Sequence, residues 1–254
     1  IFIPYIIWST FYLTYRYFYL HNLDENVSLY TYFIKGNAQY HLYFILTVIQ
    51  FYIFFPVLHR IKKGIPMIGA LVLSFILNLW WINKETIILK GNYLGEMLNN
   101  QSFILNWIFY FMLGIALSKY YNEFQEFINK YKIVLSVCIG IMFLDLMISI
   151  DINNLFTSIH SYNLIYVPLF FIFLNYIYHY IEKEPILFNT FTLIGNYSMG
   201  IYLVHVFVMY TLKRTKLFEN IAETYMFVPT LLSILAVSIF MVYLISKLPY
   251  GNYI

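Results

Sequence analysis

Long apolar runs separated by short polar segments dominate the chain. A helix that crosses a bilayer needs about 20 consecutive, mostly apolar residues. Several runs reach or approach that length, so the pattern predicts an all-α fold, a polytopic transmembrane helix bundle with about eight spans. The expected spans are Phe2–Leu20, Tyr40–Leu58, Ile65–Trp81, Ser102–Leu117, Ile133–Ile150, Tyr162–Ile181, Thr192–Leu212 and Met226–Ile245.

The polar segments between these runs differ in character. His21–Gln39 and Asn83–Gln101 are predicted to be polar loops. Asn122–Tyr131 mixes charged and aromatic residues, which predicts a short amphipathic helix on the membrane surface. The densest basic cluster of the chain is H-R-I-K-K-G at residues 59–64, directly after the second expected span.

The composition supports a membrane protein. Hydrophobic residues make up 61% of the 254 positions and charged residues only 11%, whereas a soluble domain carries about 25% charged residues. The 27 Tyr, 25 Phe and 4 Trp suit interfacial belts and helix packing. A net charge of +3 is too small to indicate a nucleic-acid partner. The single cysteine, Cys138, excludes an internal disulfide and a cysteine-based metal cluster.

Motif searches exclude several classes of protein. The chain contains no G-x-x-x-x-G-K-[ST], H-E-x-x-H, C-x-x-C or G-x-S-x-G sequence. ATP-driven transport within this chain is therefore not expected, and no metal site is predicted. Rows of intramembrane carboxylates, which a proton-coupled pump would need, are also missing. Ile1 begins inside an apolar run, so we expect the chain to be a piece of a longer protein.

The stretch G-N-Y-S-M-G-I-Y-L-V-H, Gly195–His205, brings polar side chains into an apolar run. At helical spacing Ser198, Tyr202 and His205 fall on one face, and Gly195 begins the same stripe. An ionisable group inside the bilayer is costly and marks a candidate functional site. The alternative is a polar stripe that packs against a neighbouring helix. Gly195 and Gly200 are expected to permit the close approach of a helix or a ligand.

The spacing limits what this stripe can do. Ser198 and His205 are seven residues apart, about 10.5 Å along a helix axis. They cannot share a hydrogen bond, so a Ser–His nucleophile pair within this helix is excluded. A neutral imidazole can act as a general base, and any catalytic partner of His205 must come from another helix.

Other polar or aromatic side chains within the spans are further candidates. His41 opens the second span and is either a binding residue or an interfacial aromatic, and Gln50 lies deeper in that span. Arg16 either extends to the headgroups or holds a phosphate or an acyl carrier. Trp8 either stacks on a sugar or adenine face or belongs to a lipid belt. Asp145 is expected to be structural.

Several stretches resemble one known family. Ile194–His205, I-G-N-Y-S-M-G-I-Y-L-V-H, is the most specific; Tyr40–Leu58, Ile3–Ser9 and the weaker F-Y-F-M-L-G-I of Phe109–Ile115 lie in the same order along the chain. Together they resemble the membrane acyltransferase-3 family of bacterial integral-membrane O-acyltransferases. With the ending L-P-Y-G-N-Y-I, the chain is most similar to the polysaccharide intercellular adhesin protein C subgroup.

The resemblance implies a fold and an activity. Members are bundles of about ten helices that move an acyl group, often acetyl or succinyl, from a cytoplasmic acyl-CoA to a sugar hydroxyl outside a bacterial plasma membrane. An Arg and a His on a first span, and a basic run before the proline matched by Pro4, are absent from this sequence. We therefore expect residues 1–254 to form a single integral-membrane domain that lacks the first spans and is inactive alone.

The resemblance and the polar stripe together give a mechanistic hypothesis. The missing helix supplies the general base, while the Ser198–His205 face lines a cavity and orients the acyl carrier or polarises the thioester carbonyl. His205 is the expected catalytic residue, and no metal is expected. The expected substrate-binding residues are Ser198, Tyr202, Asn196, His41, Trp8, Arg16 and Gln50.

The expected partners are the lipid bilayer, acyl-CoA as donor, a polysaccharide acceptor and a neighbouring glycan synthase, with no nucleic acid. Two other functions stay open. The adhesin subgroup has been regarded as an exporter of poly-N-acetylglucosamine, a biofilm polysaccharide. A polymer pore needs a continuous polar lining, which the spans do not obviously supply. The third reading is a non-catalytic scaffold for a glycan synthase.

Overall fold

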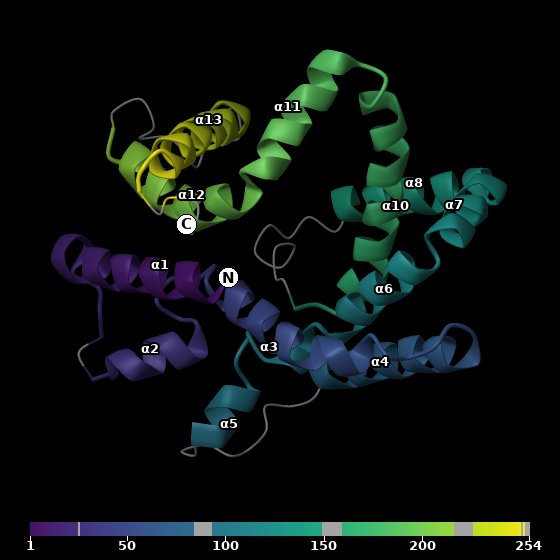
Figure 1. The fold of residues 1–254 in the computed structure, drawn as a ribbon, viewed down its shortest axis with the longest axis horizontal. Helices are drawn as coiled ribbons and strands as arrows, with labels where there is room; N and C mark the ends of the chain where they lie inside the picture. The colour runs from purple at the N-terminus through teal and green to yellow at the C-terminus, as the bar shows by residue number, and fades with distance from the viewer. Residues whose placement is uncertain (25, 84–92, 149–158, 216–225, 250, 252–254) are drawn as a thin grey trace. The chain divides into compact units, whose positions relative to one another are not determined.

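The computed structural model describes all residues except 25, 84–92, 149–158, 216–225, 250 and 252–254. The described residues form helices and no strand (Figure 1), which confirms the predicted all-α class. The chain divides into two compact units. Unit 1 comprises Ile1–Asn22 and Tyr180–Ile254, and unit 2 comprises Leu23–His179.

The helices of the two units have the following bounds. Those of unit 1 are α1 (Phe2–Tyr15), the π-helix η1 (Arg16–Leu20), α11 (Pro185–Asn196), α12 (Ser198–Lys213) and α13 (Phe227–Ser246). Those of unit 2 are α2 (Leu29–Lys35), α3 (Tyr43–Leu58), α4 (Ile65–Asn83), α5 (Tyr93–Leu98), the 3-10 helix η2 (Ile104–Asn106), α6 (Ile108–Lys119), α7 (Tyr121–Lys130), α8 (Lys132–Ile148) and α10 (Asn163–Ile181), whose last residues reach unit 1.

Three of the described helices, α4, α10 and α13, are long and apolar enough to cross a membrane. Two further pairs pass the same test together, but α7 and α8 are bent by 84° and α11 and α12 by 75°. Counting each pair as one span gives up to five, and α3 and α6 are shorter apolar helices. Apolar helices of this length confirm the membrane-spanning class.

The expected first span is helical throughout, from α1 into η1. The π-helix ends at His21, whose backbone is left-handed with φ 49°. Arg16 closes this end, because its guanidinium donates to Asn22 Oδ1 at 3.2 Å and to the Asn22 carbonyl at 3.0 Å. The prediction of a helix over Phe2–Leu20 is confirmed.

The expected fourth span is only partly helical. Residues 99–107 form turns and the short helix η2 before α6 begins at Ile108, so the prediction of a helix from Ser102 is wrong. An irregular backbone leaves amide and carbonyl groups without helical partners. In apolar surroundings such a segment is stable only where side chains form hydrogen bonds with these groups. Gln50 Nε2 donates to the Ser102 carbonyl at 2.8 Å, and its Oε1 accepts from the Ile104 amide at 3.2 Å.

Asn78 of α4 forms hydrogen bonds with backbone groups at the other end of this segment. Its Nδ2 donates to the Asn106 carbonyl at 3.0 Å, and its Oδ1 accepts from the Phe109 amide at 3.3 Å. Asn78 is fully buried. Elsewhere along their length, α4 and α6 pack through an apolar core of Met67, Met112, Ile115 and Ala116.

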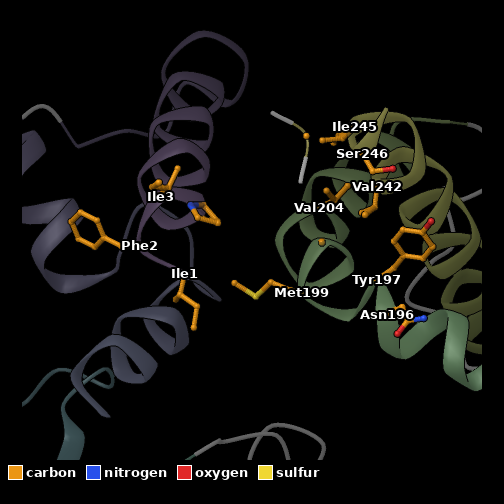
Figure 2. Close-up of a pocket in the computed structure, with 13 residues that line it drawn as sticks. Ile1, Phe2, Ile3, Asn196, Tyr197, Met199, Val204, Val242, Ile245 and Ser246 are labelled. Atoms are coloured by element: carbon orange, nitrogen blue, oxygen red, sulfur yellow. The ribbon is translucent and has the colours of Figure 1, made fainter. Parts of the chain in front are cut away.

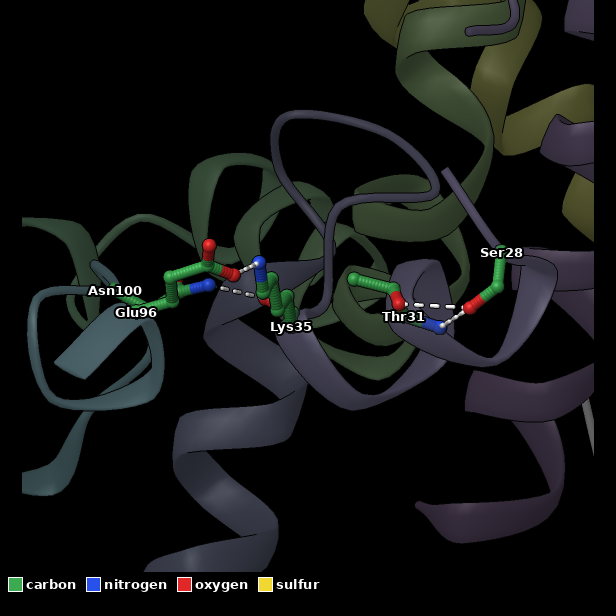
Figure 3. A network of polar contacts seen from close by, with 5 residues as sticks. All are labelled: Ser28, Thr31, Lys35, Glu96 and Asn100. Atoms are coloured by element: carbon green, nitrogen blue, oxygen red, sulfur yellow. Dashed lines mark hydrogen bonds and ion pairs between the residues drawn. The ribbon is translucent and has the colours of Figure 1, made fainter. Parts of the chain in front are cut away.

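Both predicted polar loops contain a short helix instead. Ser28 caps α2 by accepting from the Thr31 amide. Lys35 at the end of α2 forms an ion pair with Glu96 of α5, and Asn100 Nδ2 donates to the Lys35 carbonyl at 3.1 Å (Figure 3). These contacts tie α2 to α5.

Candidate functional site

The polar stripe predicted from the sequence lies at the break between α11 and α12. Tyr197 leaves the helical region, with φ −97° and ψ 3°, and a new helix starts at Ser198. The expectation of a single unbroken helix over Thr192–Leu212 is therefore wrong, and so is the prediction that Gly195 belongs to the stripe. A Cβ on Gly195 would meet no described atom within 4 Å, so Gly195 is not a point of close approach.

Helix α12 has one covered and one open face within unit 1. Its buried residues are Gly200, Leu203, Val204, Val206 and Val208. Gly200 is a point of close approach, as predicted, because a Cβ there would lie 2.5 Å from Val242 Cγ1 of α13. The predicted stripe runs along the more open face, where Ser198 is exposed and Tyr202 and His205 are half-buried.

The imidazole of His205 is oriented by its own helix. Its Nδ1 lies 2.7 Å from the Tyr202 carbonyl oxygen and 3.3 Å from that of Ile201. A carbonyl can only accept, so Nδ1 carries the proton, and Nε2 is the acceptor atom of the neutral ring. The ring of Tyr202 lies 5.9 Å away between centroids. The arrangement suits His205 to take a proton through Nε2 rather than to donate one.

Tyr12 of α1 contacts the same turn of α12. Its hydroxyl donates to the Leu203 carbonyl at 2.7 Å and accepts from the Phe207 amide at 3.2 Å. In an α-helix the carbonyl of residue 203 accepts directly from the amide of residue 207. The Tyr12 hydroxyl therefore bonds both groups of one such pair, in the turn of α12 that contains His205. Tyr12 is fully buried. The sequence reasoning missed it because one tyrosine among 27 carries no signal of its own.

Unit 1 contains a cavity of about 560 Å³ beside this break (Figure 2). Figure 2 shows Met199 extending from α12 toward the start of α1. The lining residues are Ile1, Phe2, Ile3, Pro4, Asn196, Tyr197, Met199, Gly200, Val204, Val242, Ile245, Ser246 and Gly251. Such a volume suits a small molecule, and the mostly apolar lining with a few polar groups suits a short acyl chain better than a sugar.

Only one of the predicted site residues lines this cavity. Asn196 does, whereas Ser198, Tyr202 and His205 are not among its lining residues. Trp8 is buried against Tyr12, with ring centroids 6.0 Å apart, so its indole packs inside unit 1. The structure thus has a histidine face and an apolar cavity on different sides of α12.

Three other predicted residues contact backbone or neighbouring rings. Arg16 holds the end of η1, and Gln50 holds the irregular segment before α6. His41 belongs to unit 2, is buried, and meets the ring of Tyr40 edge-on at 5.5 Å. Asp145 of α8 accepts a hydrogen bond from the Tyr166 hydroxyl of α10. No group of three or more His, Cys, Asp or Glu able to hold a metal ion occurs among the described residues.

Helices of bilayer length and apolar composition define a polytopic membrane protein. The chain belongs to the acyltransferase-3 family, since the family model described as "Acyltransferase domain" matches residues 1–247. The resemblance in the sequence is therefore confirmed over nearly the whole chain.

Curated relatives carry a different kind of name. A probable poly-beta-1,6-N-acetyl-D-glucosamine export protein of Staphylococcus epidermidis is 29% identical over 175 residues, covering 59% of this chain and 48% of the relative. A protein of the same name from Staphylococcus aureus is 29% identical over 161 residues, covering 59% and 44%. The chain thus spans about half the length of the curated relatives it matches. No solved structure gives a significant match.

Proposed function

We propose that the full-length protein is an integral O-acyltransferase of the bacterial plasma membrane. It moves an acetyl or succinyl group from a cytoplasmic acyl-CoA to a sugar hydroxyl of a cell-surface polysaccharide. The family match over residues 1–247 carries this proposal. The orientation of His205 supports it, because an imidazole fixed through Nδ1 presents Nε2 as a proton acceptor.

In this proposal His205 Nε2 takes the proton of the acceptor hydroxyl. The sugar oxygen attacks the thioester carbonyl, the C–S bond breaks, and the CoA thiolate leaves with the proton that His205 returns. The apolar cavity beside Asn196 lies on another side of α12 than His205, so it does not hold the acyl group during this transfer.

The test is the ester content of the surface polysaccharide in cells that carry the full-length gene. His205→Ala should abolish ester-linked acyl groups, while the amount of protein in the membrane stays the same. Met209→Leu, one turn further along the same helix, is the matched control and should keep the esters. Unchanged esters in His205→Ala would overturn the catalytic role of His205.

The names of the relatives favour a second candidate, export of poly-N-acetylglucosamine. The same cells separate the two functions. Deleting the gene removes esters and leaves the polymer outside if the protein is an acyltransferase. The deletion traps the polymer inside and leaves any esters intact if the protein is an exporter.

A further inference from the structure

The turn between α3 and α4, His59–Gly64, is clamped by the junction of α6 and α7. Lys119 Nζ donates to the carbonyls of His59 and Ile61 at 2.6 and 2.7 Å. The Gly64 amide donates to the Tyr120 hydroxyl, and Ile61 packs on the core between α4 and α6. These contacts make the turn a fixed structural element.

The clamped turn presents positive charge outward. The side chains of Arg60 and Lys62 are exposed, and neither side chain forms an ion pair or hydrogen bond with any residue that the structure describes. Lys63 lies over the Tyr120 ring at 4.8 Å from its centroid and 3.7 Å from a carboxylate oxygen of Glu123. Two cations of the turn therefore have no partner in the described part of the protein.

Helix α7 starts beside this turn and is amphipathic. Phe124 and Ile128 pack on the core formed with Ile139 and Ile172. Phe127, next to them on the apolar side, is 48% exposed. Because α8 is apolar and turns 84° from α7, a membrane-crossing α8 puts α7 along the membrane surface, with its uncovered aromatic side toward lipid.

The charges around α7 have one dominant sign. The basic residues of the turn and of the two ends of α7 are Arg60, Lys62, Lys63, Lys119, Lys130 and Lys132, and the acidic residues of α7 are Glu123 and Glu126. Basic residues at the end of a spanning helix or on an amphipathic helix sit at the depth of lipid headgroups. Each of them strengthens binding to an anionic surface by about fivefold.

We propose that the basic turn His59–Gly64 and α7 form a binding site for the phosphate headgroups of anionic phospholipids. The apolar side of α7 selects a lipid over a soluble phosphate, because Phe127 and Tyr121 have room for acyl chains. Lys119 and Tyr120 fix the turn so that Arg60 and Lys62 face the headgroups together. This site does not depend on the proposed acyl transfer.

The experiment counts lipids bound to the purified full-length protein in a zwitterionic detergent, by native mass spectrometry with phosphatidylglycerol as the probe. The double variant Arg60→Ser/Lys62→Ser should bind phosphatidylglycerol at least about tenfold more weakly. The matched control, Lys213→Ser/Arg214→Ser, removes two exposed cations elsewhere and should bind as the parent protein does. Phosphatidylcholine should bind weakly to all three proteins.

Further outcomes are equally decisive. An equal loss in both double variants would overturn the site in favour of bulk charge, and no loss in either would overturn it outright. Competition by millimolar inorganic phosphate would show a soluble-anion site instead. If Arg60→Ser/Lys62→Ser fails to elute as a folded protein, Arg60→Lys/Lys62→Arg replaces it. That variant keeps both charges and should retain binding, and loss of binding there would contradict a headgroup site.

Discussion

Gly200 allows helices α12 and α13 to approach closely, because it has no side chain at their contact. It lies on the covered face of α12, where α12 and α13 pack side by side, and it also lines the cavity of unit 1. Gly195, five residues earlier, is also a glycine, but no described atom lies close to where its Cβ would be. The sequence pattern treated the two glycines alike, because spacing alone cannot show which of them faces another helix.

Gly200→Ala should destabilise the protein, because its Cβ would lie 2.5 Å and 2.8 Å from the two methyl groups of Val242. Overpacking of this kind costs about 1–3 kcal/mol. Thermal unfolding in detergent measures it, with Gly195→Ala as a control that should change stability little. Adding Val242→Ala to Gly200→Ala should recover part of the loss; equal unfolding temperatures for the two single variants would contradict the packing.

At the scale of elements, unbroken apolar runs were predicted well and backbone irregularities were not. Helices α4, α10 and α13 begin and end within a few residues of the expected bounds, because their apolar runs have clear polar ends. The break at Tyr197 lies between Asn196 and Ser198, in a stretch without proline where Ser198, Tyr202 and His205 keep helical spacing, so that spacing gives no sign of the break. The irregular segment before α6 depends on amides of α3 and α4, which only the folded chain brings together.

The side-chain amide of Gln50 should contribute more to the stability of this segment than the nearby hydroxyl of Thr47. Gln50→Leu leaves the part-buried Ile104 amide without its partner, which should cost at least the roughly 1 kcal/mol of an ordinary hydrogen bond. Thr47→Val removes one donor to the Ser102 carbonyl, which still accepts from Gln50. Unfolding temperatures in detergent should therefore fall more for Gln50→Leu than for Thr47→Val. An equal fall would contradict a stabilising role of Gln50 in this segment.

Helices α11 and α12 should cross the bilayer together as one broken span. At 1.5 Å per residue they are about 18 Å and 24 Å long, and each is shorter than the roughly 30 Å hydrocarbon core. In a Cys138→Ser background, Lys183→Cys and Lys213→Cys should lie on opposite sides. A membrane-impermeant maleimide should label one of them in intact cells and both after permeabilisation; labelling of both in intact cells would show a re-entrant pair.

At the scale of the molecule, the fold class and the family could be predicted, and the division into units could not. Composition and run length suffice for a membrane helix bundle, and the stretch ending at His205 pointed to the family that the match over residues 1–247 confirms. The candidate site was predicted less well. Arg16 and Gln50 bond to backbone groups, and the partners of a side chain in a folded unit leave no mark on its own segment.

The two units should differ in independence. Residues 23–179 form unit 2 from one continuous segment, so this fragment, expressed alone, should elute from a sizing column in detergent as a single species. Residues 180–254 lack α1, which supplies Tyr12 and the ring of Phe11 against Phe207. That fragment should aggregate, and co-expression with residues 1–22 should rescue it; a well-behaved 180–254 fragment would contradict the division.

The hydroxyl of Tyr12 also sets an order of events during synthesis. Its partner Leu203 lies 191 residues later in the chain. A ribosome that adds 5–20 residues per second reaches that residue roughly ten to forty seconds after Tyr12. Until then the Tyr12 hydroxyl lacks the two backbone groups of α12 that it bonds in the finished protein. Nascent chains that stall before α12 therefore keep α1 without these two bonds, and the packing of α1 on α12 is completed only late in synthesis.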